Sequence, residues 1–158
     1  MGVDVAALPA RFAPSTPVRF IAGYLGVVAI LNTALWLARV LPGVVHSGQP
    51  QYLDGTGLPT NPVFVQDLAW WLPLALVAAG WLWRRRAWGY LAGGAILVMW
   101  TIEGPTVAVD QWWGHVNDPA SPVVSVAAVP LFAVLTLIGL VPLYLYFRAM
   151  AGGRADRG

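Results

Sequence analysis

Four long apolar stretches alternate with polar segments along the chain. They cover about 18–40, 64–83, 87–109 and 123–147. An α-helix needs roughly 20 mostly apolar residues to cross the hydrocarbon core of a bilayer, so each stretch is long enough for one span. We therefore predict an all-α, polytopic membrane protein, with a single domain over 1–158 in which four transmembrane helices form a bundle.

The charged residues follow the same alternation. Eight of the nine basic residues, all of them arginine, lie before the first stretch, between the second and third, or after the fourth: Arg11, Arg19, Arg84, Arg85, Arg86, Arg148, Arg154 and Arg157. The remaining two polar segments, with the ends of the apolar stretches next to them, hold both histidines and five of the seven acids: His46, His115, Asp54, Asp67, Glu103, Asp110 and Asp118. Because loops rich in arginine stay in the cytoplasm, we predict that both termini are cytoplasmic and that outer loops 41–63 and 110–122 build an outer cap.

Composition narrows the class of protein further. The 158 residues are 58% hydrophobic and 10% charged, whereas soluble domains carry about 25% charged residues. The arginines flank apolar stretches, which indicates contact with the lipid bilayer and its anionic headgroups rather than nucleic acid. The absence of cysteine excludes thiolate metal sites and disulfide exchange. Arginine, alanine and valine usage is typical of a bacterial genome, so we predict a multi-pass protein of the cell (inner) membrane.

The first stretch is predicted to be a retained span, since it is longer than the apolar region of about 7–15 residues in a signal peptide. Within the later stretches Pro73, Pro130 and Pro142 are expected to kink the helices. The aromatic residues collect near the predicted ends and are interpreted as interface belts, with ligand stacking by some of them as the alternative: Trp36, Trp70, Trp71, Trp81, Trp83, Trp88, Trp100, Trp112, Trp113, Tyr24, Tyr90, Tyr144 and Tyr146.

Arg39 stands out because it is the only arginine on the predicted outer side. Asp67 opens the second span after Asn61-Pro62, where a carboxylate would be stabilised by the free N–H groups of a helix start. Three interpretations stay open: Arg39 reaches lipid phosphates while Asp67 caps its helix, Arg39 pairs with Asp67 or Glu103, or Arg39 binds a substrate.

Glu103 follows sixteen residues without a formal charge and lies at or just inside the outer boundary. Asp110 is seven positions later, on the same helical face if the helix continues, although Gly104-Pro105 marks either a kink or the helix end. His115 belongs to the same segment, but no metal-ligand or nucleophile motif accompanies these residues. We therefore assign no catalytic residue, metal or cofactor.

Two further features concern packing between helices. Asn32 and Thr33, midway along the first span, are expected to hydrogen-bond across helices, with a narrow polar path as the alternative. Gly89-x-x-x-Gly93 gives the third span a smooth patch for close packing, within the bundle or in a homo-oligomer.

One part of the chain carries a resemblance. The stretch NPVFVQDLAWWLPLALVAAGWLWRRRAWGYLAGGAILV, with its Asn61-Pro62, Asp67, Pro73, Arg84–Arg86 and Trp88-Gly89-Tyr90 features, resembles small four-span membrane proteins of bacteria, especially actinobacteria, that have no assigned activity. The resemblance supports the four-span topology and implies no catalytic residue.

These observations favour a non-enzymatic membrane protein whose outer cap binds a small ligand, a cation or a protein partner. The candidate ligand-binding residues are Arg39, Asp67, Glu103, Asp110 and His115. A small-solute, ion or proton transporter subunit is the first alternative, because carboxylates at a membrane edge can mark such a route. A membrane-embedded enzyme that uses Glu103 and Asp110 is the second.

Overall fold

The computed structural model describes residues 4–45, 50, 53, 55–121 and 123–155, the last five for the backbone only. Within these residues the elements are the 3₁₀ helix η1 (Pro9–Arg11), α1 (Val18–Val45), α2 (Pro62–Gln66), the π-helix η3 (Asp67–Trp71), α3 (Leu72–Trp83), α4 (Ala87–Asn117) and α5 (Ala128–Ala155). Since α2, η3 and α3 follow one another directly, four helices are long and apolar enough to cross a membrane: Val18–Val45, Pro62–Trp83, Ala87–Asn117 and Ala128–Met150. The predicted all-helical class is confirmed.

Two helices run further than the sequence predicted. α1 passes Pro42 and ends at Val45, and α4 passes Pro105 and ends at Asn117. The segments 41–45 and 110–117, predicted as parts of loops, are therefore helical. A proline removes one backbone donor and displaces one carbonyl, and the hydrogen bonds on either side hold helices of 28 and 31 residues together.

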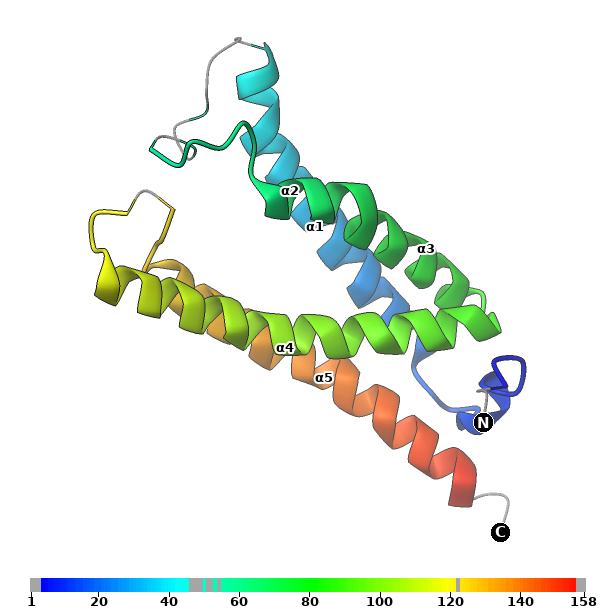
Figure 1. The fold of residues 1–158 in the computed structure, drawn as a ribbon. Helices are drawn as coiled ribbons and strands as arrows, with labels where there is room; N and C mark the ends of the chain where they lie inside the picture. The colour runs from blue at the N-terminus through cyan, green and yellow to red at the C-terminus, as the bar shows by residue number, and fades with distance from the viewer. Residues whose placement is uncertain (1–3, 46–49, 51–52, 54, 122, 156–158) are drawn as a thin grey trace.

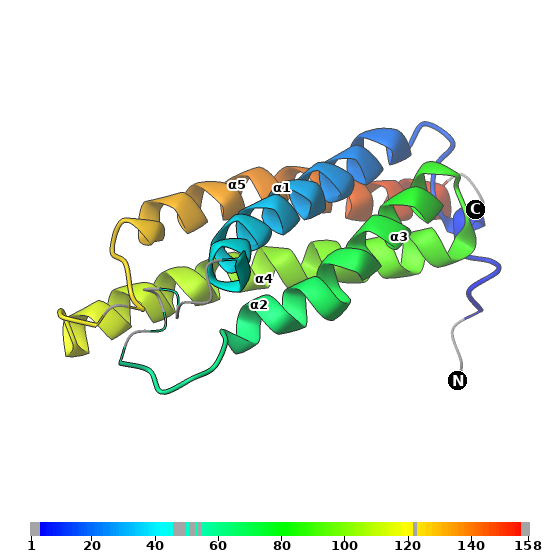
Figure 2. The same ribbon diagram turned by 90° about the horizontal axis from the view of Figure 1, so that it is seen from above.

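The helices form two antiparallel pairs. α1 packs along α3, α4 packs along α5, and the pairs meet mainly where α3 packs on α4. Figure 1 shows the pairs together at the end that carries the turn 84–86, the start of α1 and the end of α5, which we call the closed end. They diverge toward the end that carries the last turns of α1, α2 and the last turns of α4, which we call the splayed end. Figure 2, from above, shows all helices aligned along this one direction.

Glycines allow α3 and α4 to approach closely at the turn that joins them. A Cβ atom on Gly89 would collide with the backbone of Leu82 and Trp81. One on Gly93 would lie 3.2 Å from the Leu82 side chain and 3.4 Å from that of Leu25. The Gly89-x-x-x-Gly93 patch is therefore used inside the chain, where α1, α3 and α4 meet.

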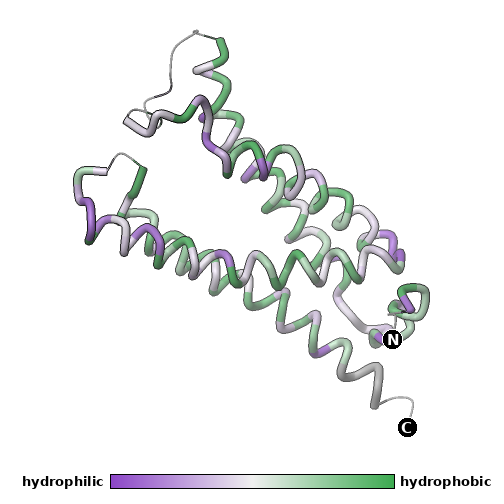
Figure 3. Tube along the Cα trace, in the orientation of Figure 1, coloured by the Kyte–Doolittle hydropathy of each residue, from purple (hydrophilic) through white to green (hydrophobic). Residues whose placement is uncertain are grey.

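The helix surfaces away from this core are mostly apolar. Hydrophobic residues run along the middle of each helix in Figure 3, and hydrophilic ones concentrate at the turn 84–86 and toward the far end of α4. Large side chains such as Leu31, Val77, Ile102 and Leu137 are exposed. Such an extensive apolar surface is rare on soluble proteins.

Two tyrosines that the sequence placed in an interface belt lie in the core. Tyr90 and Tyr146 are buried, and the Tyr146 hydroxyl donates a hydrogen bond to the Tyr90 carbonyl oxygen at 2.5 Å. The Tyr146 ring fits against α4 because Gly94 has no side chain, and a Cβ there would lie 2.5 Å from the hydroxyl oxygen. For these two residues the belt interpretation is wrong.

Candidate functional site

Asp67 carries a well-defined polar contact between helices. Its Oδ2 atom accepts a hydrogen bond from the indole Nε1 of Trp36 in α1 at 2.7 Å. The Trp36 ring is stacked on Phe64 of α2, with ring centroids 4.2 Å apart. Contacts from α1 and α2 therefore hold the carboxylate of η3 in a fixed position.

The backbone around Asp67 is unusual, and the sequence explains it. The Leu72 N–H donates to the Asp67 carbonyl five residues earlier, which makes η3 a π-helix. In a regular α-helix the ring of the next residue, Pro73, would clash with the carbonyl of Ala69. The wider π-turn just before Pro73 leaves room for the proline ring and so avoids this clash. Single π-turns of this kind are rare and often occur at functional sites.

The predicted role of Asp67 as a helix cap is wrong. The helix begins at Pro62, and the Asn61 side chain caps it by accepting a hydrogen bond from the Val63 N–H at 2.9 Å. Asparagine is a preferred cap, and proline fits the first helical position because it needs no hydrogen-bond acceptor there. Asp67 consequently lies more than one turn inside the helix.

Glu103 lies on α4 at the same level as Asp67. Asp67 is sixteen positions before Trp83, and Glu103 is sixteen positions after Ala87, on the other side of the turn 84–86. Because the two helices run antiparallel from this turn, both acids lie about 24 Å from it, at 1.5 Å per residue. The Glu103 side chain is exposed.

Two hydroxyl groups lie beside Gly139 of α5, on the closed-end side of Glu103. The Thr101 hydroxyl donates to the Leu97 carbonyl at 2.7 Å. A Cβ on Gly139 of α5 would lie 3.1 Å from the Tyr24 hydroxyl oxygen and 3.7 Å from Thr101 Oγ1. Tyr24 of α1 and Thr101 of α4 therefore meet at Gly139 of α5, and Thr101 is within one helical turn of Glu103.

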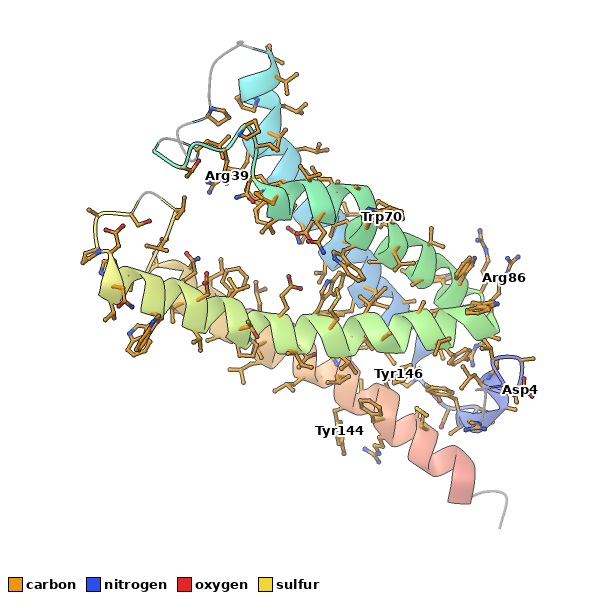
Figure 4. All side chains as sticks on the ribbon, viewed as in Figure 1. Asp4, Arg39, Trp70, Arg86, Tyr144 and Tyr146 are labelled. Atoms are coloured by element: carbon orange, nitrogen blue, oxygen red, sulfur yellow. The ribbon has the colours of Figure 1, made fainter. Side chains whose placement is uncertain are left out.

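Arg39 lies at the splayed end and is exposed (Figure 4). Among the described residues, no ion pair or hydrogen bond joins it to Asp67 or Glu103. The structure therefore does not contain the ion pair between Arg39 and Asp67 or Glu103 that was one of the three interpretations. Trp36, and not Arg39, donates a hydrogen bond to Asp67.

Asp110 and His115 occupy the last turns of α4, away from Glu103. Asp110 is exposed and accepts a hydrogen bond from Gln111 Nε2 at 3.1 Å. Seven residues along a helix correspond to about 10 Å, so Glu103 and Asp110 do not meet at a shared point. Among the residues with described positions, no three acids or histidines are grouped to hold a metal ion. His46 and Asp54 lie outside the described residues.

Trp36 was not among the expected site residues, because the predicted first span ended near residue 40 and this ring was assigned to an interface. The extension of α1 to Val45 puts Trp36 more than two turns inside the helix. Thr33, which was expected to bond across helices, instead donates to the Ala29 carbonyl of its own helix at 2.7 Å. A hydroxyl satisfied in this way needs no partner on another helix.

The structure thus places two of the five predicted site residues, Asp67 and Glu103, at one level of the bundle, and adds Trp36. Arg39, Asp110 and His115 lie nearer the splayed end. No protein-family model, curated protein or solved structure matches the chain.

Proposed function

We propose that this is an integral membrane protein that binds a small organic cation through Asp67 and Glu103, without catalysing a reaction. The proposal includes four spans in the cell membrane, both termini in the cytoplasm and a cap at the splayed end facing outward. The four helices of spanning length and their exposed apolar surfaces support the membrane assignment. The arginines at the closed end support the orientation.

The observation that carries the proposal is the pair of acids at one level inside two spanning helices. The hydrocarbon core is about 30 Å thick, and both acids lie about 24 Å from the turn 84–86. Carboxylates within transmembrane segments are energetically costly. They face the interior of the helix bundle or water, and they mark binding sites or ion routes. Neither Asp67 nor Glu103 has a basic partner among the described residues, so a bound cation would supply the missing positive charge.

The side chains around Asp67 favour an organic cation over a metal ion. Trp36 and Phe64 form an aromatic wall beside the carboxylate, and aromatic faces attract ammonium groups. Ca²⁺ takes about 6–8 oxygen ligands, more than two carboxylates provide, and the described residues offer no third acid or histidine at this point. Arg39, Asp110 and His115 lie nearer the splayed end, and we assign them to the proposed cap.

The binding proposal is tested with tetraethylammonium as the probe, by isothermal titration calorimetry on the protein in lipid nanodiscs. We expect Asp67→Asn and Glu103→Gln each to weaken binding about 10- to 100-fold, because tetraethylammonium interacts with a carboxylate through charge alone and a close charge pair contributes about 1.5 kcal/mol or more. Asp110→Asn is the matched control, as it removes the same charge from an exposed position on α4, and it should bind like the unaltered protein. No measurable binding by the unaltered protein, or equal binding by all variants, would contradict the proposal.

The orientation is tested separately with single cysteines, since the chain has none. Ser121→Cys, in the connection between α4 and α5, should react in intact cells with a thiol reagent that cannot cross the membrane. Arg85→Cys, in the turn at the closed end, should react only after the cells are opened. Labelling of Arg85→Cys from outside would reverse the proposed orientation. Ser47 lies outside the described residues and is left unchanged.

A further inference from the structure

Residues 4–17, which we call the N-terminal strap, precede α1 but pack on the other helix pair. The Phe12 ring contacts Tyr90 of α4 and Tyr146 of α5, with centroid separations of 4.6 and 4.9 Å. The Ala13 N–H donates to the Ala149 carbonyl of α5 at 3.2 Å. Figure 4 shows Tyr146 beside this segment at the closed end.

The strap is internally ordered and joined rigidly to α1. The Leu8 N–H donates to the Val5 carbonyl at 3.1 Å, and the Arg11 N–H donates to the Leu8 carbonyl at 2.9 Å. The Thr16 hydroxyl bonds to the Ala13 carbonyl, and the Val18 N–H bonds to the Thr16 carbonyl at 2.7 Å. Leu8, Phe12 and Thr16 are all buried. The strap therefore links the first turn of α1 to α4 and α5.

This arrangement matters because the strap connects the two helix pairs. α1 belongs to the pair with α3, whereas Phe12 and Ala13 contact α4 and α5. The pairs are together at the closed end and apart at the other (Figure 1). With long helices acting as levers, a small change of angle at the closed end produces a larger displacement at the splayed end.

We propose that the N-terminal strap sets the angle between the two helix pairs, and that release of Phe12 from Tyr90 and Tyr146 allows the pairs to pivot. The strap thereby controls the separation of the helices at the splayed end. Packed interfaces of this kind tend to switch between discrete arrangements rather than deform continuously. That the pivot regulates access of a cation to Asp67 and Glu103 rests on the proposed function, whereas the pivot itself does not.

The test is a distance measurement across the splayed end. Cysteines replace Val63 at the start of α2 and Val109 in α4, which are both exposed, and carry nitroxide labels for pulsed electron resonance in nanodiscs. We expect Phe12→Ala to shift or broaden the distribution of distances between the labels, with helix content unchanged by circular dichroism. Phe20→Ala is the matched control, because Phe20 is an exposed phenylalanine in the first turn of α1, and it should leave the distribution unaltered.

The outcomes are distinguishable. An identical distribution with and without Phe12→Ala, or an equal change with Phe20→Ala, overturns the strap proposal. If Phe12→Ala does not fold, the same distance measurement is made on Phe12→Leu. This variant keeps most of the apolar volume but loses the ring contacts with Tyr90 and Tyr146. Titration of the labelled proteins with tetraethylammonium distinguishes the strap proposal from the proposed cation-binding function. A changed distance without any tetraethylammonium binding by the unaltered protein supports the strap and contradicts the proposed function.

Discussion

Replacing Gly89 by alanine is expected to lower the free energy of unfolding by about 3 kcal/mol, at the upper end of the usual cost of overpacking. The added methyl group would collide with the backbone of Leu82 and Trp81, and backbone atoms cannot move aside by changing a rotamer. The turn has little freedom to adjust, because Arg85 already has a φ of 55° and the Arg86 N–H bonds to the Trp81 carbonyl at 2.9 Å. The first turn of α4 would have to shift away from α3.

The matched control for this prediction is Gly80→Ala in α3. No atom lies within 4 Å of the position where its Cβ would be, and alanine is the better helix former by about 0.5–1 kcal/mol. Gly80→Ala should therefore be neutral or slightly stabilising. Both variants are measured by reversible unfolding in mixed micelles with increasing sodium dodecyl sulfate, followed by circular dichroism. Equal stability of the two variants would show that α3 and α4 are not as close at Gly89 as described.

Replacing Leu82 by alanine is expected to cost about 2–4 kcal/mol, the range seen when a large buried side chain leaves a cavity. Leu82 is 1% exposed and touches the position of Gly93, as Leu25 does. In a membrane, helices gain little from the hydrophobic effect on association, and van der Waals packing holds them together. A cavity at the point where α1, α3 and α4 meet therefore removes much of what joins the two helix pairs.

Leu74→Ala is the control for Leu82→Ala on the same helix. Leu74 is 41% exposed, so lipid would fill the space that its side chain leaves. The same unfolding assay should give a loss well below 1 kcal/mol, typical of surface substitutions. A loss as large as that of Leu82→Ala would mean that another surface, such as that of a second copy, covers Leu74.

The two acids of the candidate site are brought to one level by a feature that can be read from the sequence. Asp67 and Glu103 are at matching distances from the turn 84–86, and antiparallel helices joined by a tight turn keep such positions at the same depth. The direction in which each acid points depends on the rotation of its helix about the helix axis. The π-turn at Asp67–Trp71 alters this rotation, and Pro73 was the only sign of it in the sequence.

Helix ends were harder to predict than helix centres. The first span was predicted to end near residue 40, and Gly104-Pro105 was expected to mark either a kink or a helix end, yet α1 and α4 pass through Pro42 and Pro105. A proline removes a single hydrogen bond, and whether the helix continues depends on what packs around it. The extra turns change the site directly, since they place Trp36 inside α1, where its indole reaches Asp67.

The sequence by itself determined that the chain has four apolar helices of spanning length, with arginines at one end and acids toward the other. Apolar length and charge are local properties that add up along the chain, so no knowledge of contacts is needed to read them. Only the tertiary structure decided which helices pair, that the pairs diverge, that Trp36 binds Asp67 and that Phe12 packs on Tyr90 and Tyr146. Helices that are apolar on all sides do not show which face meets a neighbour, and these contacts join segments far apart in the sequence.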